Sequence, residues 1–122
     1  YRADNENIQY WWNLINDELF DGVLNTPHKI TIKKFHDDTL GWCEPFGNFK
    51  KDNNRKVSIG ISAKIDNLYT FLCVLIHEMV HSWEWVIMGE WDNNIKHGKL
   101  FYSWRDGIRE KFNLPLTASY TI

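Results

Sequence analysis

Residues 67–88 read NLYTFLCVLIHEMVHSWEWVIM, a strongly apolar stretch. It is apolar on most sides and is followed by Gly89, so it predicts a long, central, buried helix. Its middle and far half carry four ionisable side chains: His77, Glu78, His81 and Glu84. Because several such groups would be costly in lipid, we expect a buried helix of a soluble domain and no membrane partner.

His77-Glu78-Met79-Val80-His81 is an H-E-x-x-H motif. On a helix, residues four apart share a face and are separated by about 6 Å along the axis. The two imidazoles can therefore meet at one metal ion, for which Zn²⁺ is the natural choice. Glu78 is displaced around the helix, where it can act on a zinc-activated water as general base and acid. The alternative is a pair of hydrogen-bonded core histidines with Glu78 at the surface.

A catalytic zinc site needs a third protein ligand. The downstream candidates are Glu84, Glu90, Asp92, His97 and Glu110. Glu84 follows on the same helix, where we expect it to orient a ligand or to face solvent. We favour His97, because Gly98 would allow close backbone approach and Phe101 could anchor the following helix in the core. An exposed loop histidine is the alternative at this position.

The segments on either side predict two more helices and three strands. Apolar spacing predicts a helix over Asp4–Phe20, and another from His97 or Gly98 to Phe112. β-Branched and alternating residues predict strands at Ile30–Phe35, Thr39–Cys43 and Val57–Ile61. Gly41, inside the second strand, marks a bulge or a close approach.

Short links between the strands favour a small antiparallel sheet backed by helices, which is an α+β architecture. A chain of 122 residues has room for one domain, so we assign residues 1–122 to a single unit. The tail Leu116–Ile122 either adds a strand or covers the core.

Composition excludes several classes of protein. With 25% charged residues and a net charge of −2, the chain is neither disordered nor globally basic. Two cysteines, Cys43 and Cys73, cannot make a disulfide framework, so we expect packed, reduced thiols. This indicates an intracellular protein, cytoplasmic, or of the nucleoid or nucleus if its role is linked to DNA.

His77–His81, followed by His97-Gly98-Lys99-Leu100-Phe101, resembles the SprT-like metallopeptidases, which include the Spartan DNA–protein crosslink proteases. Further landmarks are Phe20-Asp21-Gly22, Leu40-Gly41-Trp42-Cys43 and Ile59-Gly60-Ile61-Ser62. The resemblance implies a minimal zincin fold with an N-terminal helix, a three-stranded antiparallel sheet, an active-site helix and a ligand-bearing helix. It also implies one catalytic zinc ion, with His97 as its third ligand, and hydrolysis of peptide bonds in protein substrates.

The sequence departs from the family in two respects. It has no C-x-x-C pair of the kind found in the zinc ribbon of many members. Its basic residues form small clusters, which we interpret as solvated charges: Lys33-Lys34, Lys50-Lys51, Arg55-Lys56 and Lys96 with Lys99. Binding to DNA is therefore suggested by the family and not supported by the net charge.

Three residues are candidates for a substrate cleft: Trp42, Ile59 and Tyr102. Trp91 is a further candidate beside Trp42, and Tyr102 could polarise a substrate carbonyl, although core packing is the plainer interpretation of both residue types. The strand Val57–Ile61 could hold an extended substrate if it lies at a sheet edge. The rival to a peptidase is a zinc-stabilised, non-catalytic binding domain, including a module of a larger protein.

Overall fold

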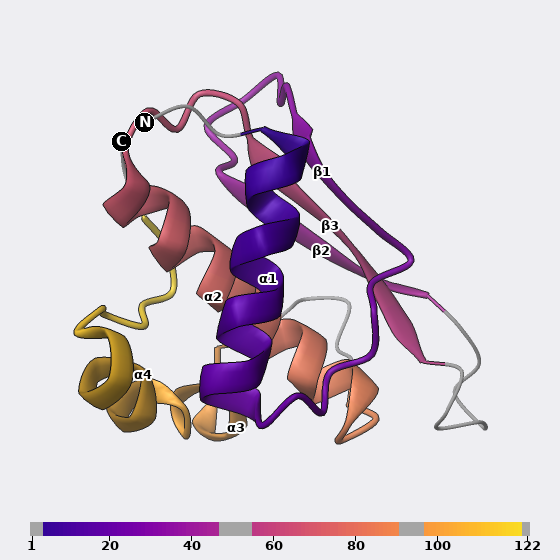
Figure 1. Cartoon of the computed structure of the whole chain (residues 1–122), viewed down its shortest axis with the longest axis vertical. Helices are drawn as coiled ribbons and strands as arrows, with labels where there is room; N and C mark the ends of the chain where they lie inside the picture. Colours follow the sequence, from indigo (N-terminus) through magenta and orange to yellow (C-terminus); the bar gives the residue numbers. More distant parts are fainter. Residues whose placement is uncertain (1–3, 47–54, 91–96, 121–122) are drawn as a thin grey trace.

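The computed structural model describes residues 4–46, 55–90 and 97–120 (Figure 1). Along these residues the elements are α1 (Asn5–Phe20), β1 (Lys29–Lys33), β2 (Gly41–Phe46), β3 (Lys56–Ser62), α2 (Leu68–Val86), α3 (Lys99–Tyr102) and α4 (Arg105–Phe112). The α+β class and the three-stranded sheet are confirmed.

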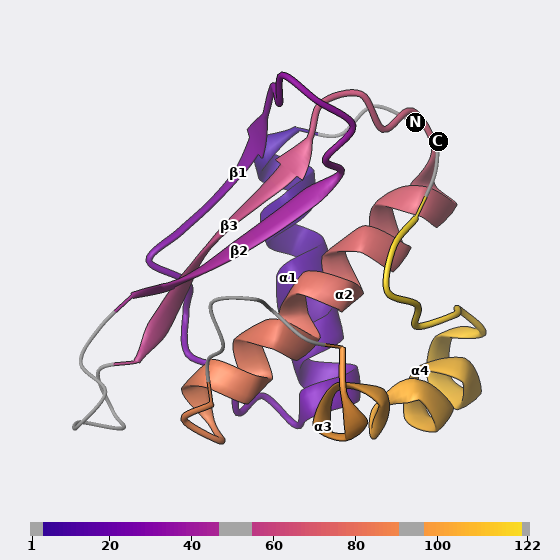
Figure 2. The same cartoon turned by 180° about the vertical axis from the view of Figure 1, so that it is seen from behind.

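The sheet is mixed, with strand order β1-β3-β2. β2 runs antiparallel to β3, but β1 runs parallel to it, so the expectation of a wholly antiparallel sheet is wrong. The short link between β1 and β2 suggested that they pair, yet β3 lies between them (Figure 2). The central place suits β3 because most of its side chains are buried.

The central position of β3 corrects a second expectation. Its residue Ile59 is paired with Ile30 on one side and Cys43 on the other. Its side chain is 1% exposed and belongs to the core, so Ile59 does not line a cleft. A strand bonded on both sides cannot accept a substrate strand. Of the two edge strands, β1 and β2, it is β2 that packs against α2.

The helix ends follow the capping residues in the sequence. The Asn67 side chain accepts a hydrogen bond of 2.8 Å from the Thr70 N–H and starts α2. At the other end, Gly89 takes a positive φ of 67° after the last turn. The single helix expected from His97 or Gly98 to Phe112 is instead two helices, α3 and α4. Ser103 and Trp104 separate them, and the Ser103 hydroxyl donates to the Leu100 carbonyl at 2.6 Å.

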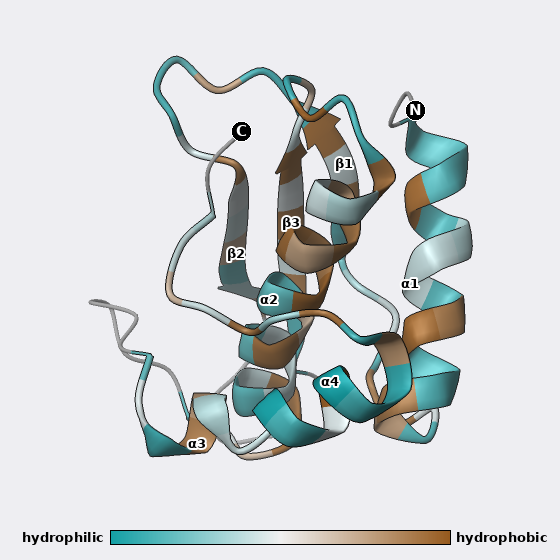
Figure 3. Ribbon diagram, turned by 90° about the vertical axis from the view of Figure 1, so that its left-hand side faces the viewer, coloured by the Kyte–Doolittle hydropathy of each residue, from teal (hydrophilic) through white to brown (hydrophobic). Residues whose placement is uncertain are grey.

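Helix α2 forms the centre of the core. In Figure 2 it lies between the sheet and the C-terminal segment that follows α4. The buried thiols Cys43 and Cys73 belong to the same core, as expected. By contrast, α4 is largely hydrophilic, with Ile108 as its buried contact (Figure 3). In the described residues, no helix is long and apolar enough to cross a membrane.

Arg55 differs from the expected solvated charge, because its side chain is 5% exposed. Its Nε donates to the Trp85 carbonyl at 2.8 Å, so the guanidinium caps the C-terminal end of α2. Lys33, Lys34 and Lys56 are exposed, as expected. Lys50, Lys51 and Lys96 lie outside the described residues.

Candidate metal centre

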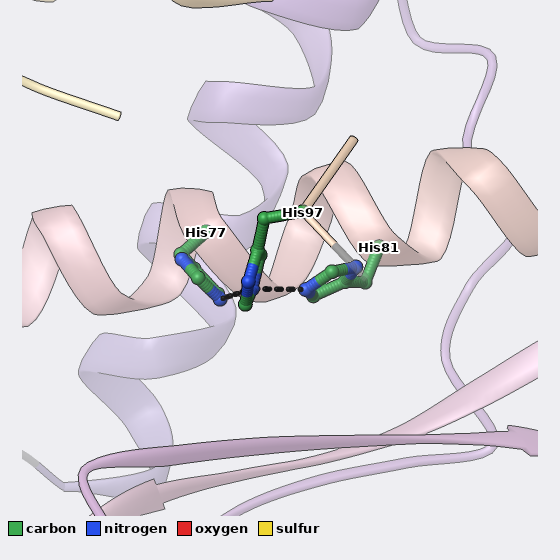
Figure 4. Close-up of side chains that lie close together, drawn as sticks. All are labelled: His77, His81 and His97. Atoms are coloured by element: carbon green, nitrogen blue, oxygen red, sulfur yellow. Dashed lines mark hydrogen bonds between the residues drawn. The ribbon is translucent and has the colours of Figure 1, made fainter. Parts of the chain in front are cut away.

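Three histidine rings meet on one side of α2 (Figure 4). His77 and His81 project from successive turns of the helix and are 8% and 4% exposed. His97 arrives from the segment before α3, with its ring between the other two. Phe101 is fully buried, and its ring centroid lies 4.7–5.0 Å from those of the three histidines. It therefore anchors α3 as expected.

The nitrogen atoms are spaced like the ligands of one ion. His97 Nε2 lies 3.2 Å from His77 Nε2 and 3.3 Å from His81 Nε2. Nitrogen ligands at about 2.05 Å from a tetrahedral zinc ion are separated by about 3.3 Å. These two separations match the edge of a coordination tetrahedron, and the ligand atoms of all three histidines lie within 4.8 Å of one another.

The hydrogen bonds of the Nδ1 atoms of His77 and His81 determine that their Nε2 atoms face His97. His77 Nδ1 donates to the Thr117 carbonyl at 2.9 Å, and His81 Nδ1 donates to Glu84 Oε1 at 3.0 Å. Both rings therefore carry their proton on Nδ1 and direct an Nε2 lone pair at His97. A proton on His97 Nε2 could make a well-directed bond to one of these lone pairs but not to both. A cation satisfies all three nitrogens, so the residues fit a bound metal ion.

The protonation states agree with metal binding. Burial, followed by repulsion from His81 and His97, lowers the pKa of His77 to about 3. Burial also lowers the pKa of His97. Both rings are therefore neutral at neutral pH, which is the form that binds metal ions. Three imidazoles are a ligand set that suits zinc.

Glu78 lies inside the protein, which contradicts the alternative that places it at the surface. Its side chain is 6% exposed, and burial raises its pKa to about 8. A cation at the three histidines would favour the ionised carboxylate and lower that pKa again. Strand β2 passes close by: a Cβ added to Gly41 would lie 2.7 Å from Glu78 Oε2. Gly41 therefore marks the close approach that its sequence position suggested.

The family comparison follows the same residues. The model of the SprT-like family matches residues 8–120. The chain belongs to the SprT-like family. It is also 31% identical over 116 residues to the germ cell nuclear acidic protein of Drosophila melanogaster. That match covers 93% of this chain and 10% of the relative, so the chain spans about a tenth of that protein's length.

The other sequence candidates of this SprT-like chain have separate places. Trp42 is half-buried on β2, with the Lys33 ammonium 4.8 Å from its ring centroid. Tyr102 is half-buried on α3 and packs against Phe101, with ring centroids 5.1 Å apart. Among the described residues, no atom lies within 4 Å of a Cβ added to Gly98, so they make no close approach of the kind expected there. Trp91 and Asp92 lie outside the described residues.

Sequence reasoning left two alternatives for the tail of the SprT-like chain and missed its contact with the metal centre. The tail covers α2 and does not add a strand to the sheet in its described part, which resolves the two alternatives. Thr117 contacts His77 through its carbonyl oxygen, and the Tyr120 ring centroid lies 5.7 Å from that of His77. The hydrogen bond from His77 goes to a main-chain atom 40 residues away, so no pattern of side chains predicts it.

Proposed function

We propose that this SprT-like chain is a zinc-dependent endopeptidase that hydrolyses peptide bonds in protein substrates. The observation that carries the proposal is the convergence of the three histidine rings on α2, the helix that also carries the buried carboxylate of Glu78. Histidines that only filled a core would not need three mutually facing nitrogen atoms, and a purely structural metal site would not need Glu78 in the interior.

The roles of the residues follow from their positions. His77, His81 and His97 hold zinc through Nε2. When bound, zinc supplies Lewis acidity, which activates water and polarises a carbonyl. Glu78 accepts a proton from the attacking water on its carboxylate and delivers it to the nitrogen of the departing amine. Glu84 and the Thr117 carbonyl hold the His81 and His77 rings in the required tautomer.

Strand β2 is the element best placed to hold an extended substrate. It lies at one edge of the sheet, and its first residue, Gly41, contacts Glu78. A peptide added along this edge by main-chain hydrogen bonds would pass beside the proposed base. This position supports β2, in place of β3, as the substrate-binding strand.

The direct test measures metal content and proteolysis in the same preparations. We expect near one zinc per chain and cleavage of an unstructured protein such as casein. Removing zinc with 1,10-phenanthroline should stop cleavage, and adding zinc back should restore it. A parallel series with single-stranded DNA tests the DNA-linked role that the family resemblance suggests. One zinc without cleavage in either series would favour a non-catalytic domain, and no zinc would contradict the site.

Replacing Gly41 with alanine should slow peptide cleavage while leaving zinc bound. The new methyl group would lie 2.6 Å from Val74 Cγ1 and 2.7 Å from Glu78 Oε2, so the carboxylate or the strand must move. Misplacing a catalytic group by about 1 Å can reduce the rate about 100-fold.

Gly107→Ala is the matched control, because the nearest atom to its added Cβ is 4.0 Å away. The cleavage rate and zinc content of each variant decide the outcome. Equal rates for the two variants would show that Gly41 does not place Glu78.

A further inference from the structure

After leaving α4, the C-terminal tail runs back toward α2 (Figure 2), and there it contacts His77 of the candidate metal centre. Leu114 and Leu116 are buried at 7% and 3% exposure and tie the tail to the core. The chain then turns outward, and Thr117 is exposed although its carbonyl accepts the 2.9 Å hydrogen bond from His77 Nδ1. The tail therefore places one main-chain oxygen on a proposed metal ligand.

The side chain of Tyr120 closes this turn. Its hydroxyl donates to the Pro115 carbonyl at 3.1 Å and accepts from the Thr117 N–H at 3.3 Å. The Thr117 hydroxyl adds a bond of 2.8 Å to the Ser119 carbonyl. The Tyr120 ring also packs edge-on against His77, at an interplanar angle of 78°. One phenol thus bonds to the main chain at Pro115 and at Thr117, the residue whose carbonyl meets His77.

The two helical ligands differ in how their outer nitrogens are held. His81 has Glu84 three residues away on the same helix, so α2 alone supplies both partners. The acceptor for His77 lies 40 residues away and is in place when the tail is packed. The orientation of His77 therefore depends on the tail turn.

We propose that Tyr120 is a positioning residue of the metal centre: it holds the Thr117 carbonyl on His77 Nδ1 and so presents His77 Nε2 to the ion. The proposal rests on the metal site of the proposed function and names a determinant of its affinity.

Tyr120→Phe tests the proposal because it keeps the ring and removes both hydroxyl bonds. We expect its zinc dissociation constant, measured by competition with a chromophoric chelator, to rise about tenfold, as for other outer partners of metal ligands. The visible spectrum of the Co²⁺-loaded variant should change in band position or intensity. Tyr10→Phe, an exposed tyrosine on α1, is the control and should match the unaltered protein in both measurements.

Thermal unfolding of the metal-free proteins separates positioning from stability. A lower melting temperature of Tyr120→Phe with an unchanged dissociation constant and spectrum would overturn the proposal, because the role would then be structural.

Nitrogen NMR of the metal-free, unaltered protein provides a second measurement that needs neither a variant nor a metal. We expect the His77 proton on Nδ1, and a proton on Nε2 would overturn the proposal. If the unaltered protein binds no zinc, the proposed function fails, and the NMR result still decides whether the tail orients His77.

Discussion

Replacing Glu78 with glutamine should leave a folded, zinc-loaded protein that no longer cleaves peptide bonds. Glutamine has nearly the same shape as glutamate, so the buried position can accept it without repacking. Its amide cannot take a proton from water. Loss of general acid–base catalysis costs about 10²–10⁴-fold in rate. Initial rates of casein cleavage, with zinc content measured by elemental analysis, test this expectation, and full activity in the variant would refute the mechanism.

The same variant has a second readout in its metal-free form. The pKa of Glu78 rises from its ordinary value of 4.5 to about 8 in the folded protein. The folded state therefore holds the proton more tightly than the unfolded state, and stability falls as pH rises between these values. His77, with its pKa lowered to about 3, acts in the opposite direction up to about pH 6.5.

The effect of Glu78 is therefore isolated between about pH 6.5 and 8. Over that range, chemical denaturation should show the unaltered protein losing stability relative to Glu78→Gln. Parallel stability curves for the two proteins would mean that burial does not perturb this carboxyl group.

Replacing His97 with alanine should lower the zinc affinity more than Tyr120→Phe does. Two histidines remain, and the nitrogen that lies 3.2–3.3 Å from both of them is lost. Loss of an outer partner costs about 10–100-fold in affinity, so loss of a direct ligand should exceed 100-fold. The dissociation constant from chelator competition measures the effect.

His36→Ala is the control, because His36 is an exposed histidine that is not among the proposed metal ligands. The metal-free His97→Ala protein should still fold, because Phe101 keeps α3 packed against the core. Equal affinities for the His36 and His97 variants would remove His97 from the site.

Local patterns determined the features that depend on neighbouring residues. Helical spacing placed His77 and His81 on one face of α2, and the start at Asn67 and the turn at Gly89 followed from capping preferences. Glu84 also orients its ligand through a contact within one helical turn. His97 lies 16 residues from His81, and the resemblance to the SprT-like family supported its selection beyond what spacing alone could do.

Tertiary structure decided what depends on residues far apart in the chain. Strand propensity predicts that a segment is extended but not which strand lies beside it. The central position of β3 between β1 and β2, and with it the burial of Ile59, could therefore not be predicted from the sequence pattern. Arg55 is buried because it meets the end of α2, 30 residues away. The turn closed by Tyr120 contacts His77 through a main-chain oxygen, and a pattern of side chains does not reveal contacts made by main-chain atoms. Short-range patterns therefore predict the helix and the chemistry on its face, whereas packing between residues far apart in the chain establishes what surrounds them.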